Sequence, residues 1–344
     1  MSSKSSGGFL RGCLIVVAIV ILIGIVFSFL FSIAIGGIAA LVASEGKTTG
    51  EDSYTTEFVS GNRDAENRIA IIDVKGEITR DTDSFSYAAS GVANSVSIVK
   101  LIKAAVKDEN VKAIIIDLDT PGGEVTASDE IYHELKLCEK PVVAMMNSLA
   151  ASGGYYVACG ANKIVAHRST MTGSIGVIIS SYDASELVSW AKVKPLFYTS
   201  GKMKSMLNPL KPVTEEESAI AQALVMNAYK IFAGIVSEAR NIPLEKITEG
   251  ELGDGRVFDG EQALANGLVD ELGYFSTAED VALELAGLTR DDCRIERFKN
   301  ESSFSDLLHM FGVKSEPITI NGVLAGSNVV LPKAGCLYYL QTGF

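Results

Sequence analysis

A short apolar run at residues 141–146 leads directly into a turn of small residues, Ser-Leu-Ala-Ala-Ser-Gly-Gly at 148–154. The run is typical of a buried strand, and the small residues after it can open a helix. Ser152 is then predicted at a helix N-terminus, where free N–H groups and the helix dipole favour negative charge. This position suits a nucleophile. The structural alternative is that Ser152 only caps the helix, while the glycines allow close packing.

A second buried-strand pattern, at residues 113–119, ends in the turn Thr-Pro-Gly-Gly at 120–123. Glycine backbone N–H groups at such a turn are not shielded by side chains and can face an oxyanion. The alternative is a plain loop in which the glycines supply unusual dihedral angles.

Strand and helix patterns alternate along the central part of the chain. Further strands are predicted at 69–74, 163–166 and 195–198, and helices at 96–106, at 125–137 and from Thr214, which with Glu217 forms a capping box. This alternation predicts an α/β fold with parallel strands, although it does not fix the topology within that class.

Four more motifs follow, at residues 172–177, 200–204, 254–260 and 263–270. Together with the two turns, their order and spacing make the chain similar to the SppA (protease IV) family of signal peptide peptidases, in its short single-unit bacterial form. The resemblance covers roughly residues 68–290, which we expect to be the protease domain. It implies a ClpP- or crotonase-like spiral of ββα units, and a homo-oligomer.

A catalytic serine needs a base, and the three histidines offer no convincing one. Ser–Lys pairs are a known alternative, in which burial must lower the pKa of the lysine. Lys202 and Lys204 lie in one loop, and the residues alone do not choose between them or exclude that both are solvated.

The resemblance selects Lys204 as general base and Ser152 as nucleophile. It also implies that Ser174 orients the lysine and that the backbone N–H groups of Gly123 and Gly153 form the oxyanion hole. No metal or cofactor is expected.

The N-terminal part predicts a membrane anchor. Residues 12–44 carry no charge and are long enough to span a bilayer. Lys4 and Arg11 precede this stretch, so residues 1–11 are expected in the cytoplasm. The protease domain is then expected on the extracytoplasmic side of the inner (cell) membrane, joined through a polar linker at 45–67. Residues 291–344 form an extension without assigned chemistry, in which 337–340 fits a strand or an apolar extension.

The composition of the chain limits the kinds of partner that it can bind. The net charge of −12 argues against nucleic acid, and the five cysteines lack CxxC spacing. The expected function is a membrane-anchored serine endopeptidase that degrades cleaved signal peptides and other hydrophobic segments. Two alternatives remain, a crotonase-like acyl-CoA enzyme and a catalytically silent membrane scaffold of the same fold.

Overall fold

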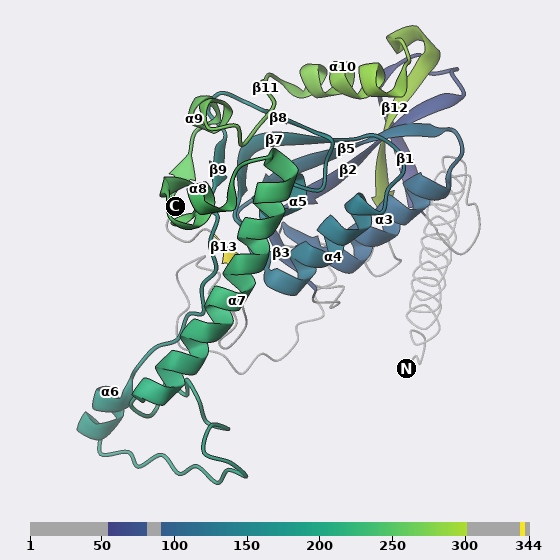
Figure 1. Cartoon of the computed structure of the whole chain (residues 1–344). Coiled ribbons are helices and arrows are strands. Elements are labelled where there is room, and N and C mark those ends of the chain that lie inside the picture. Colours follow the sequence, from purple (N-terminus) through teal and green to yellow (C-terminus); the bar gives the residue numbers. More distant parts are fainter. Residues whose placement is uncertain (1–53, 81–90, 301–337, 341–344) are drawn as a thin grey trace, which may run out of the picture. The chain divides into compact units, whose positions relative to one another are not determined.

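The computed structural model describes residues 54–80, 91–300 and 338–340. The chain divides into two compact units, Met1–Thr55 and Thr56–Phe344. Because nearly all of the first unit lies outside the described residues, so do the predicted cytoplasmic N-terminus and membrane anchor. The fold below is that of the second unit (Figure 1).

Nine strands of the described residues form one sheet, whose central strands β2, β5, β7 and β8 are parallel. Its main path runs β1 (Tyr54–Gly61), β12 (Cys293–Asn300), β2 (Asn67–Lys75), β5 (Val111–Thr120), β7 (Val142–Ala151), β8 (Lys163–Ala166) and β11 (Glu271–Leu272). β9 (Met171–Gly173) pairs with β7, and β10 (Val257–Phe258) pairs with β9.

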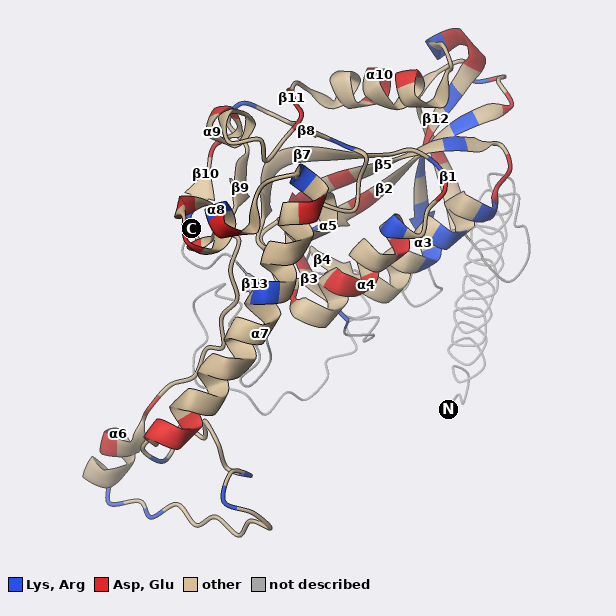
Figure 2. Ribbon diagram, viewed as in Figure 1, with Lys and Arg blue, Asp and Glu red and all other residues tan. Residues whose placement is uncertain are grey.

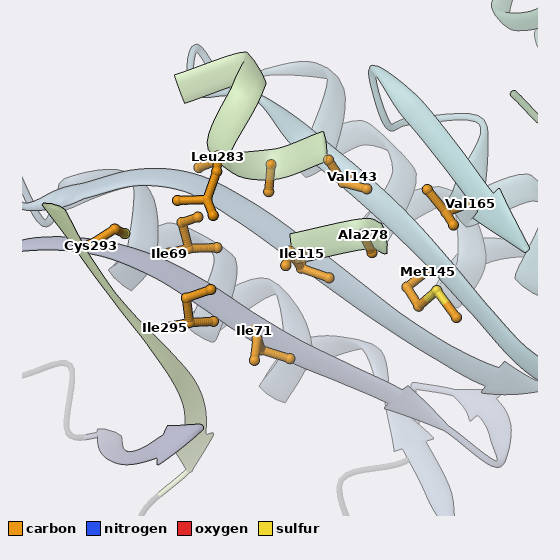
Figure 3. Close-up of a cluster of buried hydrophobic side chains, with 12 residues drawn as sticks. Ile69, Ile71, Ile115, Val143, Met145, Val165, Ala278, Leu283, Cys293 and Ile295 are labelled. Carbon is orange, nitrogen blue, oxygen red and sulfur yellow. The ribbon is translucent and has the colours of Figure 1, made fainter. Parts of the chain in front are cut away.

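Helices cover both faces of this sheet. α3 (Ser95–Lys107), α4 (Val125–Lys136) and α5 (Gly153–Ala158) lie on one side, and α10 (Phe275–Ala286) lies on the other (Figure 1). Successive strand residues point to opposite faces, so Ile69 and Ile71 face α10 and pack there with Ile115, Met145 and other buried side chains (Figure 3). Both faces are buried, which explains the continuous apolar strands.

Four other strands of the described residues form a second, smaller sheet. Its order is β13 (Tyr338–Leu340), β6 (Gly122–Glu124), β3 (Glu77–Thr79) and β4 (Val92–Asn94). A long strand, a short strand of this second sheet and a helix follow one another twice, as β2–β3–α3, with β4 inserted before the helix, and as β5–β6–α4. The α/β fold is thereby confirmed, and the repeated ββα unit agrees with the expected ClpP-like arrangement.

Some elements differ from the sequence-based expectation. β1 lies within the predicted linker at 45–67, and β12 lies within the predicted extension at 291–344; both join the large sheet. The predicted strand at 195–198 is wrong, since this apolar run forms no strand, and Leu196 and Tyr198 are 74% and 93% exposed. A strand needs a partner for its backbone groups, and this segment has none among the described strands.

The remaining helices are α6 (Ser185–Trp190), the long α7 (Glu215–Arg240), α8 (Leu244–Thr248) and α9 (Gly260–Ala265), with two short 3₁₀ turns, η1 (Glu251–Gly253) and η2 (Arg290–Asp292). The predicted capping box of α7 is confirmed, since Glu217 N–H donates to the Thr214 hydroxyl and Glu217 accepts from Thr214 N–H, both at 3.2 Å.

Within the described part of the chain, α7 is the one helix with the length and hydropathy, 1.5 on average, to cross a bilayer. Its C-terminal half packs in the folded unit, where Phe232 and Val236 are fully buried, and it contacts α5 and α8. We therefore assign α7 to the fold and not to a membrane span.

Candidate active site

Ser152 lies where β7 ends and α5 begins, and its side chain is buried. Its φ of 54° and ψ of −114° are unusual for a residue with a side chain. Such a conformation costs of order 1–3 kcal/mol and persists only where the surroundings impose it, often at functional sites. The hydroxyl makes no capping hydrogen bond to α5, so the capping alternative finds no support.

Ser174 lies beside Ser152. β9 pairs with the end of β7 through Gly173 and Ala151, and Ser152 N–H donates to the Gly173 carbonyl at 2.8 Å. Ser174 is itself buried and has a positive φ of 50°. The fold thus brings together the two serines predicted for the site, each in a strained backbone conformation.

β7 changes its partner strand shortly before Ser152, and this makes the meeting possible. β7 pairs with β8 through Val143–Met146 and then with β9 through Leu149–Ala151. Two threonine hydroxyls stabilise the part of β7 where its partner changes. Thr170 donates to the Met146 carbonyl at 3.2 Å, and Thr172 donates to the Ala150 carbonyl at 2.7 Å. Sequence reasoning missed both threonines, one just before β9 and one within it; their spacing of two residues is the signal that could have found them.

A charged cluster around the buried Asp117 lies next to this change of partner. The Asp117 carboxylate accepts from Arg297 at 2.9 Å, pairs with Lys75 at 2.9 Å and accepts from the Asn147 amide, which also donates to the Leu118 carbonyl at 3.1 Å. These groups come from three neighbouring strands and from β7 itself. Asp117 is buried and its charge is compensated by both Arg297 and Lys75, while its hydrogen bond fixes Asn147 five residues before Ser152. It was not anticipated from the sequence.

Gly123 lies on β6, next to β3 on one side and β13 on the other. A Cβ atom here would be 1.9 Å from the Ile78 carbonyl oxygen, so the position requires glycine. β6 also contacts α5, and a Cβ at Gly154 would lie 2.6 Å from Thr120 Cγ2. The Pro-Gly-Gly turn and the start of α5 therefore pack closely, which brings the strand of Gly123 near Ser152 and Gly153.

Lys204 is placed differently. It lies in the loop between α6 and α7, its side chain is exposed, and no ion pair of its ammonium group occurs within the described ranges. Its neighbour Lys202 pairs with Glu216. Figure 1 shows this loop at the end of α7 remote from α5. The single chain therefore does not bring Lys204 to Ser152.

We call residues 183–224, which comprise α6, the loop and the first half of α7, the arm. From 187 to 214 it carries five lysines and no acidic residue, in a chain of net charge −12 (Figure 2). Many of its large apolar side chains are exposed, among them Leu187, Trp190, Val193, Leu196, Phe197 and Tyr198. The arm thus combines apolar and basic groups without a cover from the described part of its own chain.

Other candidate chemistry is weaker. His133 is exposed on α4, while His167 packs against Tyr274 with ring centroids 5.0 Å apart and the rings tilted by 55°. His309 lies outside the described residues. Across the residues whose structure is described, no group of three or more His, Cys, Asp or Glu side chains has the arrangement of a metal site.

Comparison with known proteins identifies the family. Residues 134–289 match peptidase family S49, and residues 67–187 match the Clp protease family. A protein designated signal peptide peptidase SppA in Enterococcus faecium is 36% identical over 69% of this chain and 68% of its own length. Protease slr0021 of Synechocystis is 38% identical over 68% of this chain and 79% of its own.

A longer relative, the chloroplastic serine protease SPPA of Arabidopsis thaliana, is 33% identical, and the match covers 78% of this chain but 39% of the relative. The short-form relatives are thus matched over most of their length, as the motifs predicted. The chain belongs to the SppA family of serine proteases, peptidase family S49, with an α/β ClpP-like fold.

Proposed function

We propose that this chain is a serine endopeptidase that uses a Ser–Lys dyad, with Ser152 as nucleophile and Lys204 as general base. The observation that carries the proposal is the strained, buried Ser152 beside Ser174, which also has a positive φ, in a chain of the S49 family. Ser174 orients the lysine, and the N–H groups of Gly123 and Gly153 bind the oxyanion.

The reaction proceeds through an acyl-enzyme. Neutral Lys204 takes the hydroxyl proton of Ser152 while Oγ attacks the peptide carbonyl carbon, and the resulting oxyanion accepts hydrogen bonds from the two backbone N–H groups. The lysine then passes its proton to the amine nitrogen as the C–N bond breaks. A water molecule, deprotonated by the same lysine, attacks the ester carbonyl carbon. The lysine then returns the proton to Ser152 Oγ as the ester C–O bond breaks, which releases the acid product and restores the enzyme.

A second copy of the chain completes this site. A lysine acts as a base only where burial disfavours its charged form, whereas Lys204 is exposed on an arm directed away from α5. Exposed apolar patches on this scale mark interaction sites, and the lysine-rich part of the arm at 187–214 complements the acidic balance of the rest of the chain. In the homo-oligomer, the arm of one copy delivers Lys204 to Ser152 of its neighbour.

The substrates are peptides, namely cleaved signal peptides and other hydrophobic segments. The family membership supports a peptide substrate. The uncharged stretch at 12–44 supports a single-pass anchor in the inner (cell) membrane, with residues 1–11 in the cytoplasm and the protease domain outside it. This position brings the enzyme to membrane-embedded remnants. Because β1 and β12 belong to the large sheet, the folded domain is wider than 68–290 and the link is shorter than 45–67.

A serine-directed acylating probe tests the nucleophile. The full chain, purified in detergent, should acquire one acyl group on Ser152, while Ser152→Ala should acquire none and a surface control such as Ser276→Ala on α10 should react normally. Absence of labelling in the wild type would contradict the proposal and favour the silent scaffold. Acylation by an acyl-CoA, with no peptide hydrolysis, would favour the crotonase-like alternative.

A further inference from the structure

The loop that carries Lys204 has a defined backbone shape. Residues 202–207 form turns, in which Lys204 N–H donates to the Gly201 carbonyl at 3.1 Å. Leu207, three residues after Lys204, has a positive φ of 58°. A leucine keeps this conformation only where its surroundings impose it. The contacts that impose it therefore also decide how the loop presents Lys204.

Two of these contacts come from the segment that leads into α6. The Ser181 hydroxyl donates to the Leu207 carbonyl at 2.9 Å, and Ala184 N–H donates to the Pro209 carbonyl at 2.8 Å. Both acceptors lie in the part of the loop that follows Lys204. The backbone is thus held from three residues beyond the lysine onward.

A third contact is the ion pair between Lys211, in the loop, and Glu217, in the first turn of α7, with 2.5 Å between the ammonium nitrogen and the carboxylate oxygen. The side chain of Glu217 is 4% exposed, whereas Lys202, which pairs with Glu216, is 76% exposed. Solvent weakens an exposed pair, while the loss of one partner from a buried pair is costly. Of these two pairs, we expect the one between Lys211 and Glu217 to hold the loop.

Glu217 connects the loop to the start of α7 through its two carboxylate oxygens. Oε1 accepts from Lys211, and Oε2 accepts from Thr214 N–H in the capping box. The hydrogen bonds from Lys211 and Thr214 hold the pKa of the Glu217 carboxyl below its usual value, so this group is ionised at neutral pH. One buried carboxylate therefore fixes both the helix start and the direction in which the loop approaches it.

We propose that Glu217 is a positioning residue of the Ser–Lys chemistry: with Lys211 as its partner, it holds the loop in the shape that presents Lys204 to the neighbouring copy. This inference rests on the proposed function and adds a residue to it. A misplacement of about 1 Å in a catalytic group can reduce the rate by about a hundredfold. A loop that already has the right shape also loses less conformational freedom when the arm binds.

Glu217→Gln and Lys211→Met test the pair in the full chain. Glutamine still serves in a capping box, so Glu217→Gln removes the charge and keeps the helix start. If the correct loop shape falls to a tenth of the population, kcat for a fluorogenic peptide falls about tenfold. KM should change little, because neither residue is expected to touch the substrate, and Lys211→Arg should retain most of the rate.

The matched control is Glu216→Gln, the same chemical change one residue earlier, which removes only the exposed pair with Lys202 and should keep the wild-type kcat. A wild-type kcat in both Glu217→Gln and Lys211→Met would overturn the proposal. So would an equal loss in Glu216→Gln and Glu217→Gln.

The pH dependence of kcat separates positioning from a direct effect of charge on Lys204. A misplaced lysine is better solvated, which raises its pKa, so both variants should move the rise of kcat to higher pH. Through charge alone the variants would act in opposite directions, since Lys211→Met removes a positive charge and Glu217→Gln a negative one. Opposite shifts, or a lower kcat with the wild-type profile, would contradict positioning. The other charged side chains of the loop and the first turn of α7, unchanged in both variants, are Lys192, Lys194, Lys202, Glu215 and Glu216.

Hydrogen exchange keeps this inference apart from the proposed chemistry. Mass spectrometry of the full chain in detergent follows the backbone amides of residues 201–211. Their exchange should be faster in Glu217→Gln and Lys211→Met than in the wild type, and unchanged in Glu216→Gln, even if the wild type cleaves nothing. Unchanged exchange in all three variants would contradict the role of the pair in an active or inactive enzyme. Faster exchange with a wild-type kcat would show that the pair holds the loop without positioning Lys204.

Discussion

At the scale of single residues, Ser152 illustrates how this fold stores strain at one position. Its positive φ is imposed from both sides, because its N–H is bound by Gly173 and its carbonyl accepts from Tyr156 at 2.9 Å in the first turn of α5. The conformation turns the chain sharply from strand to helix, which is the geometry that presents a nucleophile. The free energy of unfolding is therefore expected to be lower than it would be with an unstrained residue at position 152.

We predict that Ser152→Gly is more stable than Ser152→Ala by roughly 1 kcal/mol in the free energy of unfolding, although both lack the hydroxyl. Glycine adopts positive φ without steric cost, whereas alanine keeps the strain of serine. Urea denaturation of the two variants, followed by circular dichroism, measures the difference. Equal midpoints would show that the backbone at 152 is not strained.

At the scale of elements, local patterns identified the strands and helices that border the site. The apolar runs at 69–74, 113–119 and 141–146 are all strands, and the glycine turn at 120–123 lies beside the start of α5 as required. These predictions worked because burial on both faces leaves a plain signature of continuous apolar residues.

The failures have a physical cause as well. The run at 195–198 is as apolar as a core strand. Composition alone does not distinguish an apolar residue buried in the core of its own chain from one buried in an interface with another chain. β13 consists of three residues paired with a strand more than 200 positions earlier, and no local periodicity encodes such a pairing. The sequence named Lys204 only through family resemblance, and its exposed position was not foreseen.

A buried cysteine at the end of α5 is expected to make the stability of the protein depend on pH. Cys159 directly follows α5 and is buried, and burial raises the pKa of its thiol from the usual 9 to about 12. The unfolded chain loses this proton near pH 9 and the folded chain does not. Stability from this group is thus complete below pH 9 and is lost as the pH rises toward 12. Cys159→Ala should show a shallower alkaline decline in urea midpoint than the wild type. Parallel curves from pH 8 to 11 would contradict this assignment.

At the scale of the whole molecule, the proposed site is divided between two copies. Ser152 is held rigidly by the sheet, whereas Lys204 lies on an arm whose aromatic side chains, such as Trp190 and Tyr198, are exposed. A division of this kind makes activity depend on assembly, so that an isolated copy does not cleave peptides.

Complementation tests the division. Ser152→Ala and Lys204→Ala, each inactive alone, should recover part of the wild-type activity when they are mixed and allowed to exchange subunits, because some sites then combine an intact serine with an intact lysine. Mixing Ser152→Ala with itself at the same total concentration is the control. A mixture as inactive as its components would place both groups in one copy.

Hydrolysis of a hydrophobic fluorogenic peptide by wild type, Ser152→Ala, Lys204→Ala and Lys202→Ala tests the Ser–Lys assignment most directly. Members of a catalytic unit fail together, so Ser152→Ala and Lys204→Ala should each reduce kcat by about 1,000-fold or more. Lys202→Ala, which removes only an exposed ion pair with Glu216, should retain most of the rate. Cleavage by Ser152→Ala at the wild-type rate would contradict the assignment. So would an inactive Lys202→Ala variant together with a Lys204→Ala variant that remains active.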